Sequence, residues 1–313
     1  MATTKPKTTA KKTAAKPKTA ATKKTVKTVK TVKPVVAPVT EVKSVGKKGG
    51  IFSGFFAKKY DTNESILTIF KKPTFYGALL AEVLGTLILT LVLFSLSFMQ
   101  MGVATVSSYA FAVLAIYVAF AGISGAHLNP IVTAGMMATR RISVIRGVMY
   151  IVAQIFGAGL GCLIFSAFHV AGGDTSYPLP AMSATPEGSF WTFTIIELFG
   201  AIILGFFFAR ALACKKGTSN FINGAVIAGS ICAATLICYV ISAAFFNISG
   251  NFMLNPAIAL MDQIFPQTGA DFGAIFGGIC SALATYAIFP MVGGVLGFYL
   301  SDFMAFLSGD KNA

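Results

Sequence analysis

The stretch GISGAHLNPI (residues 122–131) interrupts an apolar chain with groups that are costly to bury. It follows a mostly apolar run from Val103 to Ala121 and then supplies His127, Asn129 and Pro130 in close succession. A polar group moved into an apolar environment without a hydrogen bond costs roughly 2–7 kcal/mol. We therefore expect these residues to have a defined structural role at the place where the apolar run stops.

Six apolar runs follow a long N-terminal tail, and each has a length suited to a lipid bilayer. They cover residues 75–98, 103–121, 147–170, 190–212 and 221–246, with a sixth inside 274–300. A helix needs about 20 residues to cross the hydrocarbon core. Because lipid offers no hydrogen bonds to the backbone, a helix satisfies each segment internally. The sequence predicts an all-α membrane protein with six transmembrane helices.

The membrane part contains the same pattern twice, in halves covering about residues 73–170 and 190–304. AEVLGTLIL (81–89) matches IELFGAIIL (196–204), and SGAHLNP (124–130) matches SGNFMLNP (249–256). An odd number of spans in each half places the second copy upside down relative to the first. The two LNP stretches are therefore predicted to enter the membrane from opposite sides.

Each LNP stretch is followed by a short apolar segment that predicts a half-helix. PIVTAGMMAT follows Asn129, and PAIALMDQIF follows Asn255. About ten helical residues, at ~1.5 Å each, span about half of a ~30 Å core. Proline fits the first helical turn, where its missing N–H is no loss. We expect two re-entrant half-helices that meet head to head beside an aqueous cavity, where irregular backbone is tolerated.

The two asparagines have groups suited to lining such a cavity. A side-chain amide offers an acceptor oxygen and two donor hydrogens. Backbone N–H groups can hold the oxygen of Asn129 or Asn255, which leaves NH₂ donors for the cavity. Such donors, with the positive ends of two helix dipoles, suit a neutral permeant such as water and oppose a cation.

Charge is concentrated in the tail. Residues 1–59 hold 16 of the 25 Lys and Arg residues and one acid, whereas residues 60–313 have a net charge of −1. The repetitive Lys, Thr and Ala composition of the tail predicts a disordered segment. Anionic lipid and nucleic acid are the two partners that its charge favours. We assign residues 60–313 to the membrane domain.

Basic residues near the spans predict the orientation of the chain. They fall in the tail, between the second and third spans and between the fourth and fifth, whereas the other connections, 99–102, 171–189 and 247–271, contain none. Basic connections remain on the cytoplasmic side. Both termini are therefore predicted to be cytoplasmic, in a protein of the plasma (inner) membrane.

These motifs, together with YIVAQIFGAG (150–159), resemble the aquaporin and glycerol-facilitator family, the major intrinsic proteins, over about residues 73–304. The resemblance implies an aquaporin-like fold of six helices and two half-helices, one pore per subunit, and a homotetramer. It also implies a passive channel, not an enzyme, with no cofactor and no metal. The pore motifs that it assigns are Asn129, Pro130, Ile131, Asn255, Pro256 and Ala257.

The resemblance also suggests roles for three other polar residues. Glu82 and Glu197 match glutamates that brace the re-entrant loops as buried acceptors; a proton relay is the alternative. His127 matches a histidine beside the first half-helix, where pore lining and structural packing are both open.

Two departures from the family pattern affect the expected selectivity. Ile131 replaces the usual Ala of the first motif, and Ile258 replaces an Arg that usually narrows the outer constriction and repels cations. Counting along the family pattern places the constriction at Tyr109, Ser242, Phe252 and Ile258, although the extra residue in 249–256 leaves Ala243 open in place of Ser242. This predicts a constriction poor in hydrogen-bond donors.

The leading hypothesis is a passive channel for water and other small neutral solutes. Alternatives are a facilitator specialised for glycerol, urea or ammonia, and a membrane anchor whose basic tail binds nucleic acid. A coupled transporter would need Glu82 and Glu197 as ion-binding groups. The sequence contains no metal-ligand spacing, nucleophile–base arrangement or phosphate-binding loop, which disfavours an enzyme.

Overall fold

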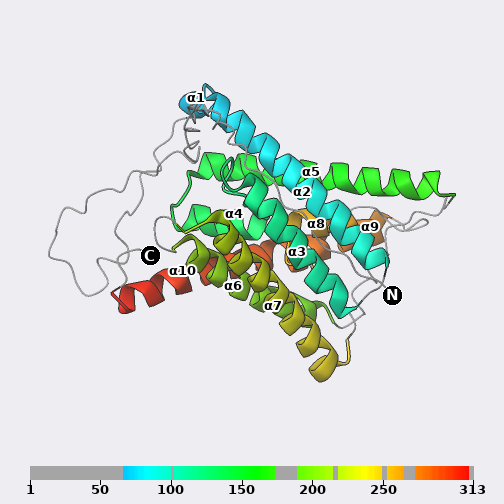
Figure 1. Ribbon diagram of the computed structural model, residues 1–313. Coiled ribbons are helices and arrows are strands. Elements are labelled where there is room, and N and C mark those ends of the chain that lie inside the picture. Colours follow the sequence, from blue (N-terminus) through cyan, green and yellow to red (C-terminus); the bar gives the residue numbers. More distant parts are fainter. Residues whose placement is uncertain are drawn as a thin grey trace, which may run out of the picture. The chain divides into compact units, whose positions relative to one another are not determined.

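A computed structural model describes residues 66–99, 102–173, 189–213, 218–248, 252–263 and 272–309. The predicted tail lies outside the described residues, so the domain boundary at residue 60 stays a prediction. Every element in the described part is helical, starting with the short α1 (Ile66–Ile69) (Figure 1).

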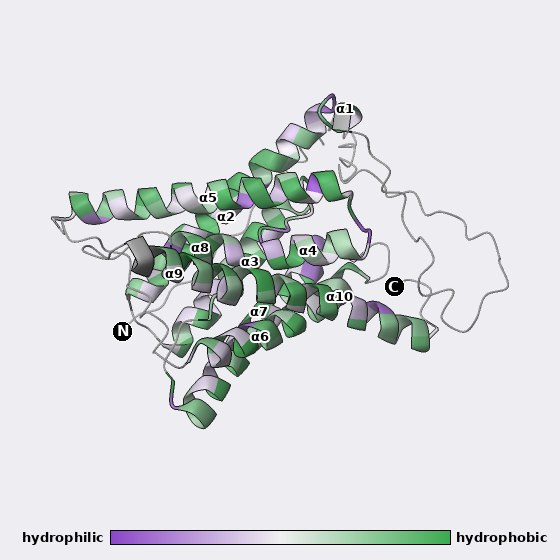
Figure 2. Cartoon of the chain, turned by 180° about the vertical axis from the view of Figure 1, so that it is seen from behind, coloured by the Kyte–Doolittle hydropathy of each residue, from purple (hydrophilic) through white to green (hydrophobic). Residues whose placement is uncertain are grey.

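Six of these helices are long and apolar enough to cross a membrane, as predicted. Five of them are α2 (Pro73–Phe98), α3 (Val103–Phe120), α5 (Val144–Ala171), α6 (Phe190–Leu212) and α7 (Asn220–Phe246). The sixth combines α9 (Phe272–Leu283), a π-helical turn η1 (Ala284–Ile288) and α10 (Phe289–Leu307), and so runs beyond the predicted end at Leu300. Figure 2 shows that hydrophobic residues cover most of the length of these helices.

Two short helices begin at the Asn-Pro motifs, as predicted. They are α4 (Pro130–Ala138) and α8 (Pro256–Gln263). Each packs against the last helix of the other half, α4 against α10 and α8 against α5. The two halves therefore interlock through their half-helices.

Glycines allow the first and last helices of each half to pack in direct backbone contact. A Cβ at Gly157 of α5 would lie 2.3 Å from the carbonyl oxygen of Val83 in α2. A Cβ at Gly293 of α10 would lie 2.4 Å from that of Leu198 in α6. Small residues permit such close approach in membranes. Val83 and Leu198 each directly follow the glutamate of their half. The two halves of the repeat therefore make the same contact between a glycine and a backbone carbonyl.

The π-helical turn in the last span has a local cause in Pro290, near the start of α10. Proline has no N–H to donate, and its ring clashes with the carbonyl of the residue four positions earlier. That residue is Tyr286, inside η1. Widening the turn to a π-helix relieves the clash.

Candidate functional site

Asn129 and Asn255 each hold the start of a half-helix with their side-chain oxygen. The Oδ1 atom of Asn129 accepts a hydrogen bond from the Ile131 N–H at 2.9 Å, and that of Asn255 accepts from the Ala257 N–H at 3.2 Å. An N-cap residue satisfies free backbone donors in this way. The oxygens are thus occupied within the protein, and the amide NH₂ groups face away from the helices.

Each asparagine also donates a hydrogen bond across to the other half. The Asn129 Nδ2 atom donates to the Leu254 carbonyl at 2.7 Å, and the Asn255 Nδ2 atom donates to the Leu128 carbonyl at 3.0 Å. Sequence reasoning missed this reciprocal pair, since it assigned both amide hydrogens to the cavity. A primary amide has two N–H groups, so each asparagine keeps a second donor, and the amide of Asn255 lies beside the Tyr109 hydroxyl.

The residues before the two asparagines have a backbone conformation that side chains rarely adopt. Leu128 has φ 52° and Leu254 has φ 47°. A left-handed conformation costs about 1–2 kcal/mol for a residue other than glycine. Their side chains fit against Gly85 and Gly200, where a Cβ would lie 2.5 and 2.8 Å from the leucine methyl groups. The conformation makes each carbonyl available to the opposite asparagine.

Glu82 is fully buried and accepts four hydrogen bonds, three from the first loop and one from α5. Its carboxylate accepts from the Ser124 hydroxyl at 2.6 Å, the His127 N–H at 3.0 Å, the Leu128 N–H at 2.7 Å and the Gln154 amide at 2.8 Å. These donors would otherwise be unsatisfied in the membrane interior. The contacts fit the bracing role that the family resemblance assigns.

Glu197 occupies the matching place in the second half and is also buried. It accepts from the Met253 N–H at 3.0 Å and lies against the N–H of Leu254. These donors correspond to His127 and Leu128 in the first half, because each pair immediately precedes the pore asparagine. Both glutamates therefore hold the left-handed turn that leads into the half-helix.

His127 belongs to a buried polar network and also lines the cavity described below. Its Nδ1 atom lies 3.2 Å from the Thr133 hydroxyl, and its ring packs edge-on against Tyr150. Thr133 in turn accepts from the Gln154 amide at 3.0 Å and donates to the Asn129 carbonyl at 3.1 Å. The network connects the start of α4 to α5.

A cavity of about 30 Å³ lies next to the asparagine pair. Its polar side includes His127, Asn129 and Asn255. The other wall is mainly apolar and includes Leu89, Val113, Val132, Leu204, Ile227 and Ile231, with the rings of Tyr109, Tyr117 and Phe208. A water molecule needs roughly 10–15 Å³ of such space. The cavity therefore has room for about two water-sized molecules.

The four residues predicted to form the outer constriction are not brought together in this cavity. Tyr109 lines it, whereas Ser242, Phe252 and Ile258 are buried elsewhere. The Ser242 hydroxyl donates to the Tyr239 carbonyl at 2.9 Å, and Phe252 stacks on the ring of Phe193. The assignment of these residues to a constriction stays a prediction.

Ile131 is fully buried, and Gly294 of α10 makes room for it. A Cβ at Gly294 would lie 2.4 Å from the Ile131 side chain. In the other half Ala257 is the counterpart of Ile131. The spacing from Gly157 and Gly293 makes Ala158 the counterpart of Gly294. Ile131, which is larger than Ala257, thus packs against Gly294, which is smaller than Ala158. The sequence did not predict this compensation.

The described residues contain no group of three or more His, Cys, Asp or Glu side chains that could hold a metal ion. The site instead consists of amide donors, two helix N-termini and an apolar wall. Together with the His127 imidazole, this arrangement can orient a small polar molecule.

The fold and the site define a membrane channel of six spans and two opposed half-helices. A family model for the major intrinsic proteins matches residues 69–300. The chain therefore belongs to the major intrinsic protein family, whose members are passive channels and not enzymes.

Relatives within the family include water and glycerol channels by name. Aquaporin AqpM of Methanothermobacter marburgensis is 32% identical over 196 residues, which cover 60% of this chain and 71% of that protein. Glycerol uptake facilitator protein-like 6 of Lactiplantibacillus plantarum is 31% identical over 236 residues, covering 72% of this chain and 96% of that protein.

The fold also matches a solved channel structure. The aquaglyceroporin from Plasmodium falciparum superposes with a TM-score of 0.53 at 18% identity, covering 74% of this chain and 96% of that one. At this identity the likeness supports the fold and carries no information about the permeant.

Proposed function

We propose that the protein conducts water passively through the pore beside Asn129 and Asn255, and that small neutral solutes follow the same path. The observation that carries the proposal is the reciprocal pair of bonds between the asparagines and the opposite leucine carbonyls. These bonds fix the direction of both amides. The second N–H of each amide is then available to a permeant molecule's lone pair.

The surroundings of the pair favour a neutral molecule. The N-termini of α4 and α8 both present partial positive charge near the asparagines. A cation at this position would meet two dipole ends and two amide donors. Water offers lone pairs to these donors and fits a cavity of about 30 Å³.

Stopped-flow light scattering of proteoliposomes under an osmotic gradient tests the proposal. We expect faster shrinkage than in protein-free liposomes, and a loss of at least about tenfold in Asn129→Leu and Asn255→Leu, which remove the amide donors from the site. Permeability equal to that of protein-free liposomes for water, glycerol, urea and ammonia alike would remove the proposal.

The outer constriction is proposed to be formed by Tyr109, Ser242, Phe252 and Ile258. Because Ile258 has no charge where the family usually has Arg, we propose weaker exclusion of protons or cations. A pH-gradient assay in proteoliposomes tests this, with a smaller proton leak expected in Ile258→Arg. A wild-type channel without a leak, unchanged by that substitution, would contradict it.

A glycerol facilitator is the second candidate, and the apolar wall of the cavity favours it. A solute with a carbon backbone can place its CH groups against Leu204 and Ile227 while its hydroxyl groups face Asn129 and Asn255. The similarity to a glycerol uptake facilitator protein-like sequence is consistent with this. Parallel measurements of water and glycerol permeability in the same liposomes separate the two candidates.

The remaining assignments concern the membrane and the partners. We propose a homotetramer in the plasma (inner) membrane with both termini in the cytoplasm. We also propose that the basic tail contacts anionic lipid; nucleic acid is the alternative partner. A peptide of residues 1–50 can be compared on anionic vesicles and on duplex DNA at physiological salt, because both contacts are electrostatic and salt-dependent.

A further inference from the structure

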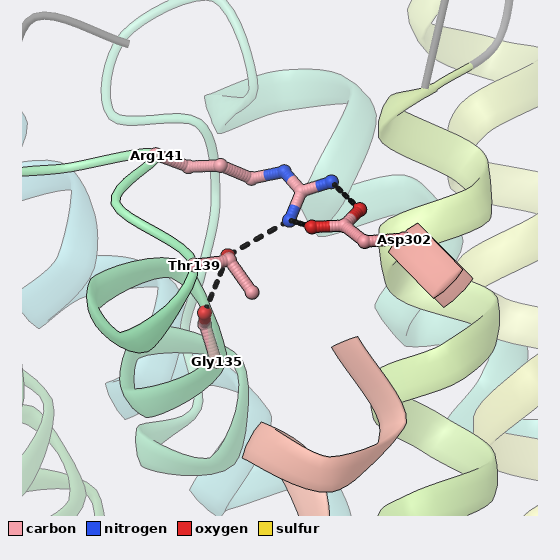
Figure 3. Close-up of polar contacts among 4 residues, drawn as sticks. All are labelled: Gly135, Thr139, Arg141 and Asp302. Carbon is pink, nitrogen blue, oxygen red and sulfur yellow. Dashed lines mark hydrogen bonds and ion pairs between the residues drawn. The ribbon is translucent and has the colours of Figure 1, made fainter. Parts of the chain in front are cut away.

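An ion pair joins the C-terminal end of half-helix α4 to α10, and the proposed pore chemistry does not use it. The Arg141 guanidinium binds the Asp302 carboxylate through two nitrogens, with N–O distances of 2.6 and 3.2 Å (Figure 3). Arg141 is 7% exposed and Asp302 is 21% exposed. Planar two-point pairing fixes the relative orientation of the two groups as well as their distance.

The same arginine holds the last turn of α4. Its Nη1 atom donates to the Thr139 hydroxyl at 2.8 Å, and Thr139 donates to the Gly135 carbonyl at 2.7 Å (Figure 3). The Tyr299 hydroxyl of α10 donates to the Ala138 carbonyl at 2.8 Å. The carbonyls at a helix C-terminus lack intrahelical partners. The Tyr299 hydroxyl and the Thr139 hydroxyl, which Arg141 holds, therefore satisfy carbonyls at this end of α4.

Phe298 extends the contact from the ion pair toward the pore. The Arg141 guanidinium lies over its ring, 5.4 Å from the centroid, and the ring occupies the space beside Gly135 of α4. Phe298 also stacks on Phe208 with ring centroids 6.2 Å apart. Phe208 lines the cavity next to Asn129. A continuous path of packed groups thus leads from Asp302 to the pore wall.

A contribution to stability does not by itself explain why this ion pair is present. Removing two charges from water offsets much of their attraction, and apolar replacements of buried pairs are often neutral or stabilising. A paired arginine does, however, specify one position for the groups that it joins. Here Arg141 joins α10 to the C-terminal end of α4, the half-helix that has Asn129 at its N-terminal end.

We propose that Arg141 and Asp302 are a positioning pair. They hold α4 against α10, which keeps Asn129 in place against the Leu254 carbonyl and keeps Phe208 at the pore wall. The pair thereby determines how fast each folded channel conducts. This inference rests on the proposed conduction of water past Asn129.

The test uses Arg141→Met, Asp302→Leu and the double variant, reconstituted in liposomes. We expect water permeability per folded channel to fall by at least about threefold in all three, because a loosened support misplaces the groups of a site. The double variant should lose no more than Arg141→Met, since that substitution already removes the ion pair together with the Arg141 contacts to Thr139 and Phe298. Arg141→Lys keeps the charge but not the planar fork, and is expected to show a similar loss.

The matched control is Arg140→Met, because Arg140 is the exposed neighbour of Arg141. It should leave permeability unchanged. If a single variant with an unpaired charge fails to fold, the double variant and Arg141→Lys decide the question. Lower yield with wild-type permeability per folded channel would overturn the proposal, because it would show a structural role only.

Hydrogen–deuterium exchange of residues 130–138 gives a second readout that does not depend on transport. We expect faster exchange in this segment in the double variant than in wild type and in Arg140→Met, because the end of α4 is released. Unchanged exchange overturns the positioning role. If wild type proves impermeable while the exchange still rises, the proposed function fails and the positioning of α4 by the pair stands.

Discussion

The two re-entrant halves hold their asparagines in the same way but brace them differently. In both halves, a glutamate holds the left-handed turn and a glycine three residues after it accommodates the leucine before the asparagine. In the first half, however, Glu82 also accepts from the Gln154 side chain of α5. Its bond to Ser124 cannot be compared in the same way, because the matching Ser249 lies outside the described residues. Asparagine geometry therefore follows the repeat, whereas the support behind it does not.

The difference has a sequence origin in the last helix of each half. Gln154 stands three residues before Gly157, and Pro290 stands three residues before Gly293. Proline cannot donate a hydrogen bond to a glutamate, and it replaces the regular helix with a π-helical turn. There the Thr285 and Thr194 hydroxyls lie 2.9 Å apart and link the turn to α6. Pro290, in the place that matches Gln154, therefore both lacks a donor for Glu197 and changes the local helix.

The largest expected effect compares Glu82→Leu with Glu197→Leu. Each buried donor left without a partner costs about 1–3 kcal/mol, and the described contacts leave more such donors at Glu82. We expect Glu82→Leu to lower stability by several kcal/mol, and by more than Glu197→Leu. Thermal unfolding in detergent, followed by size-exclusion chromatography, measures both. Equal losses would remove the asymmetry between the halves.

A smaller effect is expected where the two motifs differ in size. Gly294→Ala places a methyl group against Ile131, and overpacking typically costs about 1–3 kcal/mol. Adding Ile131→Ala should restore only part of the loss, because it removes the side-chain clash but leaves the Ile131 carbonyl oxygen 2.7 Å from the new Cβ. The same unfolding assay applies to both single variants and the double variant, and strictly additive losses would show that the two positions are independent.

The link at the π-helical turn should contribute less. Thr285→Val removes the hydroxyl that lies 2.9 Å from that of Thr194. Side-chain hydrogen bonds between membrane helices contribute about 0.6 kcal/mol on average. We expect a loss of that order in an SDS unfolding titration, with Thr194→Val and the double variant as the other members of a double-mutant cycle. A strictly additive cycle would exclude coupling between the two hydroxyls.

The smallest expected effect is a gain in stability at Ala126, which is buried with φ 47° in the first loop. Glycine adopts this conformation without strain but has more freedom in the unfolded chain. Ala126→Gly should therefore raise stability by less than about 1 kcal/mol. A loss of stability in the unfolding assay would show that the Ala126 methyl group packs more favourably than its backbone is strained.

The sequence by itself determined the spans, the inverted repeat and the start of each half-helix. These features depend on local signals, namely the length of apolar runs, the position of proline and the number of spans per half. Asn129, Asn255, Glu82 and Glu197 were found in the same way, because each occurs twice at matching places.

Only the tertiary structure revealed the bonds between the halves. The reciprocal asparagine contacts, the fit of Ile131 against Gly294 and the pairing of Arg141 with Asp302 join residues that lie far apart in the chain. No local pattern indicates such partners, because they depend on how helices from opposite halves approach each other. The same reason leaves the predicted constriction open, since Ser242, Phe252 and Ile258 are placed by counting along the chain and not by contact.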